Sequence, residues 1–546
     1  MSKKSKNKNL KKEKKKSALT LVEHQEIAHL IQNGLAFHNK GQLDQASFIY
    51  EQIRQKSPEN IDAIQLLGAI AGQKKQWDKA LELFSQVIKI NKNNPHVFCN
   101  QGIVFKELGL FDQALESYDK AIALKHDFAE VHNNRGFVLQ ELNRAKEALA
   151  SYNQAIHLKN DFFVAYNNRA LALQELGEFA QALKSCNLAI DIKKDYALAY
   201  NTRGLILQDL GNIKDALSSY EQAIALSQEF SEAHWNRSCA LLLSGDLENG
   251  FKEHEWRWKN EKLESFKQKR IFNCPLWLGE ESLENRTILL HSEQGFGDTI
   301  QFCRYALLVA RRGAKVFLEV EKPLVTLLSH MEGIDRIIEK GSALPELDFH
   351  CPLLSLPLAF KTTLYSIPCE IPYIKSDEIQ VSQWQKKLGP KKKIRIGIAW
   401  SSHSSFKKDT QRSLLFEQLL TALPLDLFEF ICLQKELKDN DRSGFEKSGL
   451  PFFGEELTDF SQTAALIDSL DLVISTCTSI PHLSAALGKP TWILLQFVPD
   501  WRWMLETEQS PWYSSVRLFR QKTLGEWSGI FDRMKVELMK LSGALI

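Results

Sequence analysis

The sequence predicts an α-helical solenoid followed by two α/β domains with parallel sheets. Two observations lead to this fold class. In the first half, small residues recur every 34 positions without a slip. From about residue 286, buried apolar runs typical of strands alternate with helix-like segments. At 546 residues the chain is too long for one hydrophobic core, so several domains are expected.

Each 34-residue unit has a small residue, a second small residue twelve positions later and, in most units, an aromatic four positions after that. The first small positions are Gly34, Gly68, Gly102, Gly136, Ala170, Gly204 and Ser238. The aromatics are Tyr50, Phe84, Tyr118, Tyr152 and Tyr220. Small residues let two antiparallel helices approach closely, and the aromatic fills the space beside them. This pattern resembles the tetratricopeptide repeat over residues 27–260, which stacks helix pairs into a superhelix with an inner groove.

An asparagine stands two residues before the first small position in four units: Asn100, Asn134, Asn168 and Asn236. One position per repeat points to one face of a solenoid, so these side chains predict a ladder of amides. An amide both donates to and accepts from a peptide backbone. The ladder is similar to that of O-GlcNAc transferases and implies a groove that binds a protein or peptide. Capping or bridging of neighbouring helices is the alternative interpretation.

The second half alternates strands with helices, which predicts two parallel sheets in tandem. The strands are expected at 286–294, 314–320, 335–340, 348–360 (with a loop), 394–400, 427–434, 471–476 and 490–495. The intervening helices are expected at 302–313, 323–331, 413–423, 459–470 and 481–488. Ligands of such sheets bind at the carboxyl ends of the strands, and twin domains place that crevice between them.

Four motifs in this half carry a resemblance: "GFGDTIQF", "IGIAWSS", "QRS" and "LVISTCTSIPHLSAALGKPTWILL". They occur in the order seen in ADP-heptose:lipopolysaccharide heptosyltransferases, over residues 286–500. With the solenoid in front, the chain resembles bacterial tetratricopeptide proteins that have a heptosyltransferase-like domain. The resemblance implies a GT-B glycosyltransferase that moves a sugar from a nucleotide-diphosphate donor to a hydroxyl, on a protein recruited by the solenoid. A non-catalytic peptide-binding scaffold with a degenerate transferase domain is the alternative.

The "GFGD" loop follows the first strand of the second half. Asp298 matches the heptosyltransferase aspartate proposed as the base that deprotonates the acceptor. Gly295 and Gly297 would let the backbone turn sharply and approach a ligand in the cleft. An aspartate at the start of a helix is also a good cap for the first turn. Both roles stay open for Asp298.

The donor side is expected around "STCTSIPHLSAAL". Thr478 and Ser479 stand just before a short helix, where hydroxyls and backbone amides can hold a diphosphate. His482 is expected either to donate to the same phosphate or to pack under the loop. Arg412 and Ser413 stand where the family has a basic residue on the phosphate, or else cap the next helix. The family usually has an aspartate where this chain has Cys477, which places the activity in question.

Charge and composition bound the remaining possibilities. Residues 1–17 hold nine lysines and one glutamate, so a disordered basic tail is expected, and the rest of the chain is mildly acidic. The nine scattered cysteines favour a reducing cytoplasm, and no apolar run is long enough to insert stably in a membrane. No histidine–carboxylate cluster has metal-ligand spacing, so we expect no metal and no cofactor beyond the nucleotide-sugar co-substrate. Because the chain beyond residue 17 is mildly acidic, we expect no nucleic-acid partner. The expected domains are 1–17 (tail), 18–262 (about seven repeats), 263–388 (acceptor side) and 389–546 (nucleotide-sugar side).

Overall fold

The computed structural model of the chain describes residues 25–401 and 413–543. The basic tail and Arg412 lie outside the described residues. The chain forms two compact units, Met1–Thr202 and Arg203–Ile546, which are treated separately below. The fold class is as predicted: helix pairs of a solenoid come first in the chain, and two parallel sheets follow. The predicted domain boundaries stay predictions, because the division into compact units falls within a repeat.

The repeats consist of helix pairs, with residues 25–39 forming the described part of the first helix. The first helices of the following units are α3 (Ile61–Gln73), α5 (Pro95–Glu107), α7 (Ala129–Glu141), α9 (Phe163–Glu175), α11 (Ala197–Asp209) and α13 (Ser231–Ser244). The second helices are α2 (Leu43–Lys56), α4 (Trp77–Ile90), α6 (Phe111–Leu124), α8 (Ala145–Leu158), α10 (Phe179–Ile192), α12 (Ile213–Leu226) and α14 (Leu247–His254).

The glycines of the repeat lie directly against the aromatics. A Cβ on Gly68 would lie 2.5 Å from Phe84 Cε1, and one on Gly136 would lie 2.6 Å from Tyr152 Cε1. Both aromatic rings are buried. The fifth unit departs from this pairing at both positions, because Ala170 replaces the glycine and Cys186, sixteen residues later, replaces the aromatic. A larger first residue therefore goes together with a smaller second one.

Two glycines one turn apart on α3 test this packing. We expect Gly68→Ala to destabilise the solenoid by about 1–3 kcal/mol, because the added methyl overlaps the buried Phe84 ring. Gly72→Ala is the matched control, since its Cβ would meet only Val104 Cγ2 at 3.6 Å. It should stabilise the helix by up to about 1 kcal/mol. Thermal unfolding followed by circular dichroism measures both, and shifts of the same sign would contradict the packing argument.

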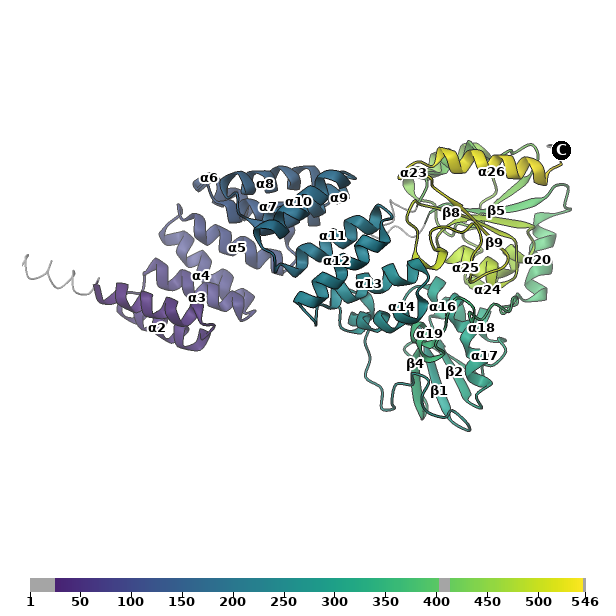
Figure 1. Ribbon diagram of the computed structural model, residues 1–546, viewed down its shortest axis with the longest axis horizontal. Coiled ribbons are helices and arrows are strands. Elements are labelled where there is room, and N and C mark those ends of the chain that lie inside the picture. Colours follow the sequence, from purple (N-terminus) through teal and green to yellow (C-terminus); the bar gives the residue numbers. More distant parts are fainter. Residues whose placement is uncertain (1–24, 402–412, 544–546) are drawn as a thin grey trace, which may run out of the picture. The chain divides into compact units, whose positions relative to one another are not determined.

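The second unit contains two parallel sheets (Figure 1). The first has the order β3-β2-β1-β4 and consists of β1 (Thr287–His291), β2 (Lys315–Val320), β3 (Arg336–Glu339) and β4 (Phe349–Pro352). The second has the order β6-β5-β7-β8-β9 and consists of β5 (Arg395–Ala399), β6 (Glu429–Cys432), β7 (Leu472–Thr476), β8 (Thr491–Leu495) and β9 (Val516–Arg520). In register, Leu289 faces Phe317 and His350, and Gly397 faces Ile431 and Val473. The strand order reverses between β1 and β4 and between β5 and β7.

Helices cover both faces of the second sheet (Figure 1). One face packs on α22 (Phe416–Leu420), α23 (Asp439–Ser448) and α26 (Ser528–Leu541), and the other packs on α24 (Phe460–Asp468) and α25 (Ser479–Ala486). α20 (Glu378–Leu388) lies against α24, with Trp384 donating to Gln462 at 3.0 Å. The alternating strands and helices produce this double cover, as expected for a buried parallel sheet.

The first sheet is covered differently on its two faces. Ile288, Leu290 and Leu318 belong to the large core of the unit. That core also includes residues of α17 (Ala306–Ala310), α18 (Lys322–Leu328) and α19 (Leu356–Ala359). The opposite face, with Leu289 and Phe317, packs on loop residues such as Phe272. Residues of α12–α14 join the large core, so the last repeat of the unit and the first sheet share one interior.

Candidate functional site

The carboxyl ends of the strands position the predicted site residues of the second unit. Asp298 follows β1, Ser413 follows β5 across the undescribed segment, and Thr478 follows β7. Strands β1, β5 and β7 each border the point where the strand order of their sheet reverses. Open parallel sheets bind ligands at such points, outside the carboxyl ends of the strands. The sequence motifs therefore lie where the topology favours a binding site.

Asp298 lies in the first turn of α16 (Phe296–Phe302), a helix that starts earlier than the sequence predicted. Its Oδ2 accepts the backbone N–H of Gly295 at 3.0 Å. Its Oδ1 accepts from Nη2 of Arg502, which stands 204 residues further along the chain. The carboxylate thus reaches back to the helix start from the third helical residue rather than from the cap position. Its role as a base stays a prediction.

The two loop glycines differ in what they provide. Gly295 is the N-cap of α16 and has φ −74° and ψ 168°, an extended backbone that any residue adopts. A Cβ on Gly297 would lie 3.1 Å from His482 Cδ2 and 3.5 Å from Ser479 Cα. Gly297 therefore allows α16 to approach α25 closely. The loop after β1 and the loop after β7 meet at this contact.

Arg502 links the loops of the two sheets. It lies in η4 (Trp501–Trp503), after β8, and is buried. Its Nε donates to Gln301 Oε1 at 2.6 Å, its Nη1 donates to Asp500 Oδ1 at 2.9 Å, and its Nη2 donates to Asp298. Burial alone would lower the pKa of Arg502, but the charges of Asp500 and Asp298 raise it above its ordinary value. The ion pairs of this arginine were not predicted from the sequence.

His482 packs under the loop, which is the second of its two predicted roles. The ring is buried; its Nδ1 lies 3.0 Å from the Tyr513 hydroxyl, and it stacks on Trp503 with ring centroids 5.1 Å apart. Burial, reinforced by the charge of Arg502, lowers the pKa of His482 to about 3. The ring is therefore neutral at physiological pH and supports the site rather than supplying a charge.

This burial predicts a pH dependence of stability. As the pH falls from about 6.5 towards 3, unfolded chains take up a proton at His482 that folded chains exclude. The contribution of His482 to the free energy of unfolding is therefore fully present above pH 6.5 and is lost progressively below it. The loss from this residue is about 1.4 kcal/mol per pH unit in that window. Unfolding midpoints between pH 7 and pH 5 should fall less steeply in His482→Gln, which cannot titrate. Equal slopes in the two chains would contradict the prediction.

Thr478 and Ser479 begin α25 as predicted from their place after a strand. Thr478 is the N-cap, and its Oγ1 accepts from Ile480 N at 3.3 Å. Cys477 precedes it, and its Sγ accepts from Trp503 Nε1 at 3.1 Å. Ser413 is half-buried, and the N–H of the next residue, Leu414, donates to Trp400 O at 2.8 Å, beside the end of β5.

The asparagine ladder is half-buried at all four positions. Asn168 on α9 donates from Nδ2 to Asn133 Oδ1 on α7 at 3.0 Å. This contact is the bridging of neighbouring helices that the sequence left open as the alternative. The peptide-binding role of Asn100, Asn134, Asn168 and Asn236 stays a prediction.

Sequence reasoning missed a buried ion pair beside the candidate site. Arg257 in η1 (Glu255–Trp258) donates from Nε and Nη2 to the two carboxylate oxygens of Glu293, both at 2.9 Å. Its guanidinium also donates to Glu255 at 2.6 Å and Ser355 at 2.7 Å. Glu293 belongs to the loop that leads from β1 to Asp298. Residues 36 positions apart carry no local pattern, so this pair could not be predicted from the sequence.

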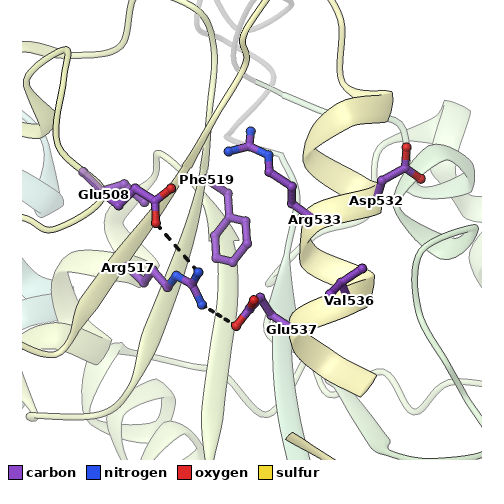
Figure 2. A pocket seen from close by; sticks show the side chains of 8 residues that line it. Glu508, Arg517, Phe519, Asp532, Arg533, Val536 and Glu537 are labelled. Carbon is purple, nitrogen blue, oxygen red and sulfur yellow. Dashed lines mark hydrogen bonds and ion pairs between the residues drawn. The ribbon is translucent and has the colours of Figure 1, made fainter. Parts of the chain in front are cut away.

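A surface hollow of about 260 Å³ lies elsewhere in the unit, between β9 and α26 (Figure 2). Three of its charged side chains pair with one another: Arg517 donates to Glu537 at 2.7 Å and lies 3.7 Å from Glu508. β9 and α26 carry none of the predicted site residues, so we do not place the site there. Among residues 25–401 and 413–543, no group of three or more potential ligands is arranged to hold a metal, and no helix is long and apolar enough to cross a membrane.

Comparison with known proteins bears on the first half of the chain. Family models described as tetratricopeptide repeats match residues 39–98, 104–143, 129–162, 164–196 and 201–253. Protein FlbA of Caulobacter vibrioides is 26% identical over 298 residues, which cover 48% of each protein, so the chain spans about half the length of this curated relative.

Solved structures similar to the chain are also repeat proteins. YrrB, titled a TPR protein with an unusual peptide-binding site, is 17% identical and has a TM-score of 0.29, covering 34% of this chain and 95% of its own. A tetratricopeptide repeat protein from Parabacteroides merdae is 19% identical and has a TM-score of 0.37, covering 44% and 95%. The family models confirm the predicted repeats, a protein-interaction scaffold that points to peptide or protein binding.

Proposed function

We propose that the chain is a glycosyltransferase that moves a sugar from a nucleotide-diphosphate donor to a hydroxyl of a protein recruited by its repeats. One observation carries the proposal: the loops at the strand-order reversals of both sheets meet. Gly297 lies against the start of α25, and Asp298 pairs with Arg502. The order of the motifs, similar to that of heptosyltransferases, gives this meeting point a chemical interpretation.

The residues divide into roles that the contacts support. Asp298 is the base, because its carboxylate lies at the junction of the two loops with its side chain 21% exposed. The donor diphosphate binds at the start of α25, where the hydroxyls of Thr478 and Ser479 lie at the positive end of the helix. Ser413, which follows β5 in the chain, is assigned to the donor side as well, and Arg412, assigned there by the resemblance, lies outside the described residues. His482 does not contact the donor in this proposal; it supports the loop through Tyr513 and Trp503.

A non-catalytic scaffold is the second candidate, and specific contacts favour it. Asp298 is engaged by Arg502, and Cys477, where the resemblance predicts an aspartate, accepts from Trp503. A degenerate transferase domain would keep such internal contacts after losing its substrates. The repeats would then supply the whole function by binding a partner protein.

Donor binding and turnover separate the two candidates. The purified chain is mixed with ADP-, UDP-, GDP- and CDP-sugars, and binding is measured by calorimetry, while release of the nucleoside diphosphate is measured with a protein extract as acceptor source. We expect one nucleotide class to bind, and Thr478→Ala to weaken that binding about tenfold by removing a cap and a hydroxyl at the donor site. Asp377 caps α20 in a comparable way, since its Oδ1 accepts from Gln380 N at 2.8 Å. Asp377→Ala removes that cap and should leave donor binding unchanged. Absence of binding by a folded chain would select the scaffold.

A further inference from the structure

The guanidinium of Arg502 has one donor group that differs from the others. Nε is held by Gln301 at 2.6 Å, and Nη1 is held at 2.9 Å by Asp500, which stands two residues before it on the same loop. Nη2 donates to Asp298, the predicted base, on the other sheet. If Nη2 changes partner, the hydrogen bonds of Nε to Gln301 and of Nη1 to Asp500 remain, so the guanidinium keeps its position.

The same guanidinium lies beside the predicted diphosphate site. The neighbouring Trp503 donates to Cys477 at 3.1 Å, and Cys477 is adjacent to Thr478, the cap of α25. Cys477 is also near Arg502 itself, because a negative charge on its sulfur would raise the pKa of the arginine. A buried arginine next to the positive end of a helix attracts a diphosphate strongly, because guanidinium and phosphate form paired, charge-assisted hydrogen bonds.

Two buried donor groups at this place are unsatisfied. Gln301 Nε2, on the amide whose oxygen binds Arg502, has no hydrogen-bond partner within the described residues, and neither does the hydroxyl of Thr476 at the end of β7. Both side chains are fully buried. Buried polar groups are nearly always paired, so an unpaired amide nitrogen on the side chain that binds Arg502, and an unpaired hydroxyl one residue before Cys477, indicate a place prepared for an acceptor.

We propose that Arg502 is a diphosphate ligand that exchanges Asp298 for a phosphate oxygen of the donor, so that donor binding releases Asp298 for the acceptor. This inference rests on the proposed function and adds an order of events to it. A carboxylate paired with arginine is a weak proton acceptor, and one released from it is a better base. Asp298 would therefore become competent as a base only when the donor is in place.

Calorimetric titration of the full chain with inorganic pyrophosphate, ADP, UDP and GDP tests the exchange. In wild type, Asp298 competes with the ligand for Nη2. Asp298→Asn should therefore bind the preferred diphosphate more tightly, by about tenfold. Arg502→Lys, which keeps the charge but not the paired geometry, should bind about tenfold more weakly. Asp377→Asn makes the same chemical change on α20 and should bind as wild type does.

The outcomes are distinguishable. Diphosphate binding that Asp298→Asn leaves unchanged or weakens overturns the exchange while leaving the donor site in place. Binding unaffected by Arg502→Lys does the same, with circular dichroism confirming that each variant is folded. If folded wild type binds none of the four probes and does not bind CDP, both the exchange and the proposed transferase are overturned. If Arg502→Lys does not fold, Asp298→Asn alone decides, because asparagine keeps the shape of the side chain.

Discussion

Replacing Arg257 with methionine should lower the free energy of unfolding of the sheet-bearing unit by about 3–5 kcal/mol. The guanidinium is fully buried and binds two carboxylates, Glu293 and Glu255, and the Ser355 hydroxyl. Methionine has a similar volume but leaves Glu293, 3% exposed, as an uncompensated buried charge. Eleven of the twelve tryptophans lie in this unit, so tryptophan fluorescence during chemical unfolding measures its stability.

A surface ion pair provides the matched control for this substitution. Arg286 and Asp348 lie 3.0 Å apart with side chains 58% and 36% exposed. Arg286→Met should change stability by no more than about 1 kcal/mol, because exposed pairs contribute little. Glu293→Gln should cost less than Arg257→Met, since an amide oxygen still accepts from the guanidinium. Equal losses in Arg257→Met and Arg286→Met would show that the buried pair contributes no more than a surface one.

The second large effect concerns the proposed chemistry. We expect Asp298→Asn to lower the rate of sugar transfer about 10²- to 10⁴-fold, the usual contribution of a general base. The amide keeps the shape of the carboxylate but cannot take the acceptor proton. Transfer is measured as nucleoside diphosphate released under saturating donor, so that tighter or weaker donor binding does not enter the comparison.

Asp377→Asn is the control for Asp298→Asn, because Asp377 also accepts a backbone N–H at the start of a helix, here α20. It should transfer at the wild-type rate. Each variant is checked by thermal unfolding, since Asp298 also holds Arg502. A folded Asp298→Asn chain with unchanged turnover would remove Asp298 from the reaction and leave it only as a helix-start and ion-pair residue.

The sequence allowed the repeats and the order of the strands to be predicted because both depend on local patterns. The 34-residue spacing reflects a contact between positions sixteen residues apart, such as Gly136 and Tyr152, and that contact repeats. Eight of the strands were readable as buried apolar runs. The ninth, β9, was not expected, because "VRLFR" places two arginines in five residues, and both arginines are only partly buried.

The candidate site was predictable in its parts and not in its connections. The motifs placed Asp298 and Thr478 on loops after strands, and topology brought those loops together. The hydrogen-bond partners of Asp298 and His482 come from distant segments. Arg502 lies 204 residues from Asp298, and Tyr513 lies 31 residues from His482. No periodicity encodes such pairs. Burial also decided what the sequence left open, since a neutral, stacked His482 follows from how deeply α25 packs.

The substitution of Ala170 and Cys186 for a glycine and an aromatic limits how the repeats can be recombined by protein engineers. A chimera that joined the first helix of the fifth unit to the second helix of the fourth would place an alanine methyl against the ring of Tyr152, as close as the 2.6 Å that a Cβ on Gly136 would have. A chimera that includes the fifth unit therefore keeps its packing when both helices of that unit are exchanged together. The natural cutting points are the turns that follow the second helices, and a cut within the helix pair of the fifth unit would produce chimeras that clash or contain a cavity.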